Sequence, residues 1–188
     1  PEYVAGKLSQ IDCPHAKLIL NADELCSALL LPENPRVYYA IARQEGDGVI
    51  PPNRVNDCPD CPRCGAALDY DYVRYAHVGH VHCEKCGFAS PAADWLAEGL
   101  DTKNRRLTLR HGDRVYDLPM LHDSLVHSYS ELAAVAGRFE MGLSAGAIRA
   151  ALAAHGVEDC FAAVVGNDDV PYSVCFYADS DDQDIPWP

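Results

Sequence analysis

Short apolar runs near the start of the chain alternate with polar, turn-forming stretches. Residues 17–20 and 36–42 are rich in Leu, Ile, Val and Tyr, a composition typical of strands. Between these runs leucines recur at helical spacing, and Asp23 can cap a helix that continues through Leu31 and ends at Pro32. The order strand, helix, strand predicts part of a parallel sheet in an α/β fold.

Similar patterns continue in the second half of the chain. Residues 106–110 and 115–118 are strand-like runs on either side of a His-Gly-Asp turn, which predicts a β-hairpin. Residues 128–139 and 144–155 each place apolar residues on one side of a helix. Many of these residues are alanines, so the two helices can pack closely.

Changes in composition divide the chain into segments. A linker rich in Gly, Pro and Asn at 46–56 leads into a cysteine-rich stretch, and the chain closes with strand-like runs at 161–165 and 173–177 before an acidic run at 179–184. We expect the cysteine-rich module and the sheet to be separate units. The expected segments are an α/β part at 1–56, the cysteine-rich module at 57–91, the remainder of the α/β part at 92–156, and an unassigned acidic segment at 157–188.

Four cysteines carry the clearest chemical signal. Cys61-Pro-Arg-Cys64-Gly and Cys83-Glu-Lys-Cys86-Gly are two Cys-x-x-Cys pairs with eighteen residues between them. The glycine after each pair lets the backbone turn so that both sulfurs face one cation, and two pairs complete a tetrahedral four-thiolate shell. The pattern predicts a zinc ribbon. Four protein ligands leave no position for water, so the zinc is expected to be structural.

Other chemistry is open to these cysteines. A disulfide or a redox-active pair would also use Cys-x-x-Cys, but redox motifs occur singly at a helix start, behind a strand. Cys58 forms a further Cys-x-x-Cys with Cys61, yet glycine follows Cys64 and not Cys61, which favours Cys58 as a spare thiol. His77, His80 and His82 could replace a ligand, although polar residues of a half-exposed hairpin are the simpler interpretation.

Charge and composition bear on the partners and the compartment that we expect for this chain. The net charge is −13, with 15 Lys and Arg against 28 Asp and Glu, so we expect no nucleic-acid partner, because phosphate backbones are bound through positive charge. No apolar run approaches the length of a bilayer span, so no transmembrane segment is expected. Nine cysteines, an odd number with four at metal spacing, favour a reduced, cytoplasmic compartment.

Three stretches resemble the MurT family, the Mur-ligase-like subunit of the lipid II isoglutaminyl synthase. Leu20-Asn21-Ala22-Asp23 is similar to the end of a central-domain strand in Mur ligases, and 61–91 is similar to the four-cysteine ribbon that MurT proteins insert in that domain. Residues 128–134, followed by Gly142-Leu143 and Ile148, resemble a helix that Mur ligases open with an Asn-x-x-Asn pair. The resemblance covers about residues 3–156.

The resemblance implies an ATP- and magnesium-dependent ligase subunit in peptidoglycan synthesis. With a GatD-like glutaminase that supplies ammonia, it would amidate the glutamate of the lipid II stem peptide through an acyl phosphate. Asn21 and Asp23 would lie near the nucleotide, although a strand-end turn and helix cap explain these residues equally well. His127 and Ser130 stand where the family has its two Asn, and they can hydrogen-bond a base edge without the paired donor and acceptor of an amide.

The family's Gly-x-x-Gly-Lys-Thr phosphate loop does not occur in this sequence. In the family that loop lies upstream of the stretch that begins here, and the start at Pro1 predicts a fragment of a longer protein that is inactive by itself. No catalytic residue can be assigned. The alternative is a degenerate relative, a non-catalytic interaction module whose ribbon and acidic surface dock a protein.

Overall fold

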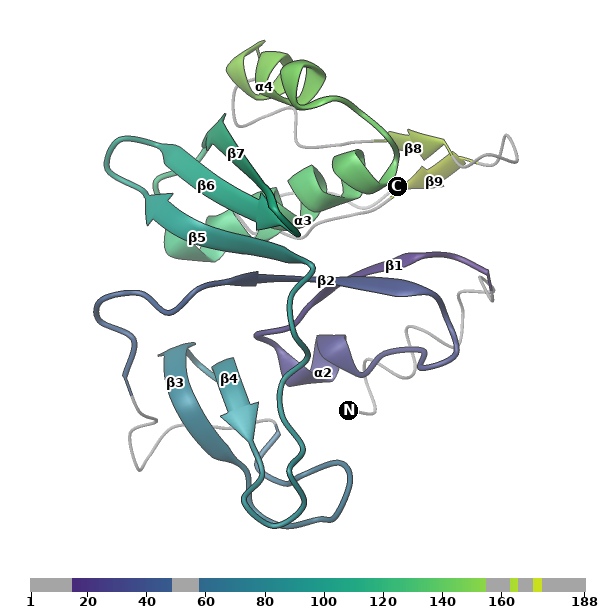
Figure 1. Cartoon of the computed structure of the whole chain (residues 1–188), viewed down its shortest axis with the longest axis vertical. Helices are drawn as coiled ribbons and strands as arrows, with labels where there is room; N and C mark the ends of the chain where they lie inside the picture. The colour runs from purple at the N-terminus through teal and green to yellow at the C-terminus, as the bar shows by residue number, and fades with distance from the viewer. Residues whose placement is uncertain (1–14, 49–57, 155–162, 166–170, 174–188) are drawn as a thin grey trace, which may run out of the picture.

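The computed structural model describes residues 15–48, 58–154, 163–165 and 171–173. Its centre is a five-stranded sheet with the order β1-β2-β5-β6-β7 (Figure 1). Strands β1, β2 and β5 are parallel, and β6 and β7 extend the sheet antiparallel, which confirms the α/β class. The strands are β1 (Leu18–Asn21), β2 (Arg36–Ile41), β5 (Trp95–Asp101), β6 (Arg106–His111) and β7 (Arg114–Pro119).

The first two predicted strands pair as expected. Leu18 lies opposite Arg36, and Asn21 lies opposite Tyr39. The strands are parallel, so both carboxyl ends reach the same edge of the sheet. This edge, just after Asn21 and Ile41, is where parallel sheets usually place their functional loops.

Strand β5 was not predicted from the sequence. It reads Trp-Leu-Ala-Glu-Gly-Leu-Asp, and Ala, Glu and Gly are weak strand formers. It is nevertheless the middle strand of the sheet, because β2 pairs with it on one side and β6 on the other. A bulge lies at its centre, where the register shifts between Ala97 and Gly99. Pairing on both sides overrides the weak local preference of these residues.

The first predicted helix is shorter than expected. It is the four-residue α2 (Leu25–Ala28), and it does not extend to Leu31. The cap also differs from the prediction, since the carboxylate of Glu24 accepts the amides of Cys26 and Ser27 at 2.9 and 2.7 Å. Asp23 is therefore free for other partners.

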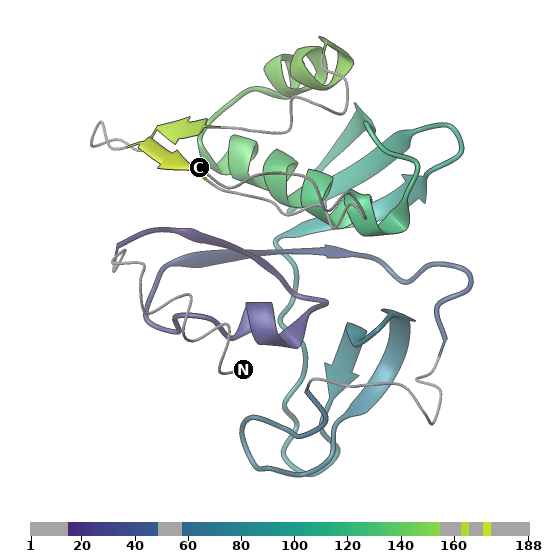
Figure 2. The ribbon, with the colours of Figure 1, turned by 180° about the vertical axis from the view of Figure 1, so that it is seen from behind.

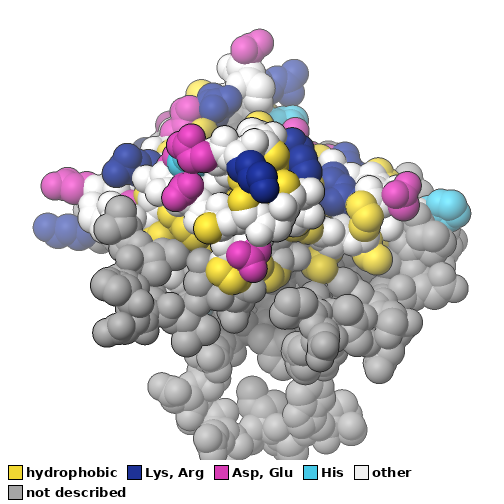
Figure 3. Space-filling view, turned by 90° about the horizontal axis from the view of Figure 1, so that it is seen from below, with side chains coloured by type: hydrophobic (Ala, Val, Ile, Leu, Met, Phe, Trp, Pro, Cys, Tyr) yellow, Lys and Arg dark blue, Asp and Glu magenta, His cyan; other side chains and the backbone are white. Residues whose placement is uncertain are grey.

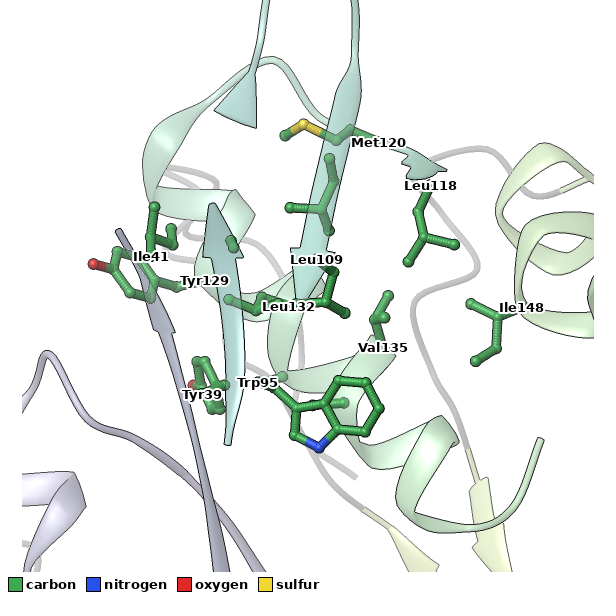
Figure 4. Packing of buried hydrophobic residues seen from close by; sticks show 14 of the residues in the cluster. Tyr39, Ile41, Trp95, Leu109, Leu118, Met120, Tyr129, Leu132, Val135 and Ile148 are labelled. Carbon is green, nitrogen blue, oxygen red and sulfur yellow. The ribbon is translucent and has the colours of Figure 1, made fainter. Parts of the chain in front are cut away.

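Helices α3 (Leu125–Glu140) and α4 (Ala145–Ala154) confirm the two predicted helices, with α3 starting one turn early. Figure 2 shows α3 in front of the sheet, so it covers the face that points away from the viewer in Figure 1. The core between α3, α4 and the sheet is drawn in Figure 4. Within it, Trp95 stacks between His111 and Phe139, with ring centroids 3.9 and 4.7 Å apart.

The cysteine-rich segment forms an antiparallel pair, β3 (Asp69–Tyr75) and β4 (Val78–His82). It occupies the connection between the neighbouring parallel strands β2 and β5, which always needs a crossover. Both ribbon views place the pair below the sheet, beside α2. The β-ribbon predicted between the two cysteine pairs is thus present.

Several predictions fall on residues outside the described ranges. These are the helix cap at Gly156, the acidic run at 179–184 and nearly all of the strand-like run at 173–177. Nearby, the structure describes the short antiparallel pair β8 (Ala163–Val165) and β9 (Pro171–Ser173). Among the described residues, no helix is long and apolar enough to cross a bilayer.

Gly79 allows the two ribbon strands to approach closely, because it has no side chain. A Cβ on Gly79 would lie 2.1 Å from the carbonyl oxygen of Tyr72, which is backbone and cannot rotate away. We predict that Gly79→Ala lowers the free energy of unfolding by roughly 3 kcal/mol or more, since the strands must separate. Urea unfolding followed by circular dichroism measures the change.

Gly146→Ala in α4 is the matched control. There the nearest atom to the new Cβ is Ser144 Oγ at 3.8 Å, an ordinary contact, so stability should rise slightly or stay constant. Equal unfolding midpoints for the Gly79 variant and the wild type would show that the strands do not approach so closely at Gly79 and Tyr72.

Candidate functional site

The two cysteine knuckles have the same backbone design. Gly65 N donates to Cys61 O at 2.8 Å, and Gly87 N donates to Cys83 O at 2.9 Å. Both glycines have positive φ, 67° and 69°, a conformation that side chains disfavour. The glycine after each pair, visible in the sequence, is therefore what lets each knuckle turn.

The knuckles bring four thiols together. The Sγ atoms of Cys61 and Cys86 are 3.5 Å apart, those of Cys64 and Cys83 are 3.6 Å apart, and all four lie within 4.8 Å of one another. A tetrahedron with metal–sulfur bonds of about 2.3 Å has edges of about 3.8 Å. The spacing therefore fits a tetrahedral ion with four thiolate ligands.

The four thiols affect one another's ionisation. Burial opposes ionisation of Cys61, but the backbone amides of Arg63 and Cys64 and the neighbouring thiols outweigh it and lower its pKa to about 7. Burial, with the surrounding thiols, raises the pKa of Cys86 to about 12. Thiolates this close repel one another, and a divalent cation between them would remove that conflict.

The other candidate ligands lie elsewhere. The Cys58 thiol lies beside Cys26, and burial together with this thiol raises the pKa of Cys26 to about 12. His77 contacts Glu24 at 3.2 Å, and His80 and His82 both contact one carboxylate, that of Asp71. The only metal-like cluster among the described residues is the set of four cysteines.

A second site lies where the ribbon contacts the sheet, and Arg74 forms its centre. The side chain of Arg74 is fully buried, and its guanidinium binds Asp47 through two nitrogens at 3.2 and 2.8 Å and Asp23 at 3.1 Å. The same group donates to the carbonyl oxygens of Ile41 and Ala42 at the end of β2. In the described part of the chain the ribbon strands and the five-stranded sheet are separate sheets, and this buried ion pair joins them.

Both carboxylate oxygens of Asp23 accept hydrogen bonds from protein groups. Its Oδ2 accepts from Ile41 N at 3.0 Å and from the hydroxyl of Tyr129 at 2.7 Å, in addition to Arg74. Its Oδ1 accepts the hydroxyl of Tyr72 at 3.4 Å. Burial and then the charge of Asp23 raise the pKa of Tyr72 to about 12, so this hydroxyl keeps its proton and donates.

The four residues suggested for a nucleotide come from two places, the end of β1 with the turn that follows it, and α3. Asn21 is buried at the end of β1, where its side chain accepts the amide of Asp23 at 3.0 Å. His127 and Ser130 are half-buried on α3, and His127 stacks on His122 with ring centroids 4.8 Å apart. Helix α3 reaches Asp23 through Tyr129, which directly precedes Ser130. Burial and the neighbouring His127 lower the pKa of His122.

The residues around Asp23 were missed by sequence reasoning. Arg74 stands alone among aromatic residues in Tyr70-Asp-Tyr72-Val-Arg74-Tyr, and Tyr129 belongs to an apolar helix face. A lone arginine inside a strand of this kind was the available signal, since buried arginines are almost always paired.

The sequence relatives of this chain are MurT subunits. No protein-family model matches the chain. The MurT subunits of the glutamine-hydrolysing lipid II isoglutaminyl synthase of Staphylococcus aureus, strains COL and N315, are each 33% identical over 129 residues, which is 68% of this chain and 28% of the relative. The MurT subunit of Streptococcus pneumoniae is 27% identical over 124 residues.

The chain is a partial, MurT-like domain. A solved structure agrees, since the type C pseudomurein peptide ligase of Methanothermus fervidus superimposes with a TM-score of 0.59 and 27% identity. It is matched by 74% of this chain over 27% of its own length. The MurT resemblance stated from three sequence stretches is thus confirmed. The chain spans little more than a quarter of each of these relatives.

Proposed function

We propose that this chain is part of a MurT-type ligase subunit that works in peptidoglycan synthesis. It would supply a portion of the central α/β domain and a zinc-binding ribbon. The complete protein would use ATP to amidate the glutamate of the lipid II stem peptide. The observation that carries the proposal is a four-thiol ribbon set in the crossover between β2 and β5, in a chain whose relatives are MurT subunits.

Zinc is the metal that we propose for Cys61, Cys64, Cys83 and Cys86. Four thiolates at tetrahedral spacing suit zinc, and such closed shells contribute folding free energy without an open position for a substrate. The chemical step would therefore depend on residues elsewhere in the complete protein. The ribbon would serve as a rigid, metal-folded insertion.

The remaining components of the proposal belong to the complete protein. The relatives are named as glutamine-hydrolysing, which supports a GatD-like glutaminase partner that supplies ammonia. ATP and magnesium would bind mainly outside this chain. Asn21, His127 and Ser130 stay candidate nucleotide contacts, whereas Asp23 would shape the strand end, since its oxygens already accept protein donors. A cytoplasmic location is part of the same proposal.

A non-catalytic interaction module is the second candidate. The engagement of Asp23 by protein donors favours it, and so do the replacements at His127 and Ser130. Nucleic acid is not the partner that we propose. Figure 3 shows Lys and Arg side chains interspersed with Asp and Glu on the described part of the lower face, and the chain's net charge is −13.

We predict one zinc per chain, measured by elemental analysis after gel filtration. Cys83→Ser should abolish stoichiometric zinc, because it removes one of the four converging thiols. Cys58→Ser is the matched control and should keep the zinc, because Cys58 lies outside the cluster of four. Loss of zinc in the Cys58 variant, with retention in the Cys83 variant, would reverse the ligand assignment.

The ligase role is tested on the full-length parent subunit with a glutaminase of the GatD type, lipid II, glutamine, ATP and magnesium. Mass spectrometry should detect conversion of the glutamate carboxyl group to an amide, in which NH2 from ammonia replaces OH. Amidation should persist in Cys58→Ser and fall at least about tenfold in Cys83→Ser, in which the ribbon is unfolded. A folded, zinc-loaded parent that forms no amide under these conditions would favour the interaction module instead.

A further inference from the structure

The knuckles and Arg74 lie on the same hairpin. Strands β3 and β4 pair from Asp69 and His82 at one end to Tyr75 and Val78 at the other. Cys83 directly follows β4, so the thiol cluster lies at the first end, and Arg74 lies near the second. Any change in the pairing of β3 with β4 therefore moves Arg74 relative to the sheet.

The opposite side of the contact belongs to the sheet and α3. Asp23 follows β1, Asp47 follows β2, and their side chains are only 2% and 4% exposed. Arg74 is the cation that both carboxylates contact. Buried carboxylates without a partner are strongly unfavourable, so this arrangement of the strand ends requires the guanidinium.

Further contacts join the same parts. Gly79 N in β4 donates to Asp23 O at 2.7 Å, and Gly48 and Val73 exchange two backbone hydrogen bonds of 3.0 and 2.7 Å. Arg74 also donates to the hydroxyl of Tyr129, which itself donates to Asp23. The ribbon is thus hydrogen-bonded to the end of β1 and, through Tyr129, to the start of α3.

We propose that Arg74 is a positioning residue through which the metal-folded ribbon fixes the ends of β1 and β2 and the first turns of α3. This inference rests on the zinc site of the proposed function, because metal binding to four thiols would supply the folding free energy of the hairpin. When the metal leaves, the hairpin opens and Arg74 withdraws. Asp23, Asp47 and Tyr129 then lose their shared partner and rearrange.

Hydrogen exchange measured by mass spectrometry on the 188-residue chain tests this. The protein is compared with and without a strong zinc chelator. Chelation should speed exchange about tenfold or more in the ribbon, in 36–42 and in 125–133, because these segments meet at Arg74. The hairpin of β6 and β7, residues 106–119, is the internal control and should not change.

Arg74→Met in the zinc-loaded protein tests the effect of the Arg74 side chain separately from the effect of metal loss. It should speed exchange in 36–42 and 125–133 while the zinc content and the protection of 83–88 stay unchanged. Arg63→Met is the matched control, because Arg63 lies on the same ribbon, exposed over the Phe88 ring, and should alter neither segment. If Arg74→Met does not fold, Arg74→Lys retains the charge without the two-nitrogen contact and should give a smaller increase in the same segments.

Chelation effects confined to 58–90, or wild-type exchange in Arg74→Met, would overturn the inference. Measuring the bound zinc distinguishes failure of this inference from failure of the proposed function. Absence of bound zinc would refute the zinc site, and the Arg74→Met comparison would still test Arg74. Bound zinc with unchanged exchange at the strand ends would refute only the positioning role.

Discussion

The buried ion pairs of Arg74 are the constraint on which the arrangement of this chain depends. The guanidinium of Arg74, from the ribbon, contacts the carboxylates that follow β1 and β2. It also donates hydrogen bonds to two carbonyl oxygens at the end of β2. Such a group is stable inside a protein only when all its partners are in place. The ribbon, the parallel strands and α3 therefore have one mutually consistent arrangement, although the described strands of the ribbon and of the five-stranded sheet form separate sheets.

This constraint changes how the inserted ribbon is understood. A four-thiol module in a crossover connection could be joined to the sheet by flexible linkers alone, without packing against it. Here its knuckles and its sheet contact lie at opposite ends of one hairpin, with Cys83 next to one end and Arg74 near the other. A metal at the thiols would therefore stabilise more than the knuckles. That would give the insertion a role in shaping the ends of β1 and β2.

Local sequence signals predicted much of this chain. Glycine-supported cysteine spacing predicted the thiol cluster, and strand composition predicted β1 and β2. The misses have tertiary causes. Strand β5 is held by neighbours on both sides, Glu24 replaced Asp23 as the helix cap, and Asp23 turned toward Arg74. Arg74 and Tyr129 lie 51 and 106 positions from Asp23. Contacts over such separations leave no periodic pattern, so the partners of Arg74 and Tyr129 could not be assigned from the sequence.

A double-mutant cycle between Arg74 and Asp23 tests the central claim most directly. Urea unfolding of the wild type, Arg74→Met, Asp23→Asn and the double variant gives four free energies of unfolding. The buried pair predicts a coupling energy of about 2 kcal/mol or more, with the double variant less destabilised than the sum of the single changes. Effects that add within about 0.5 kcal/mol would contradict it, since independent sites behave in that way.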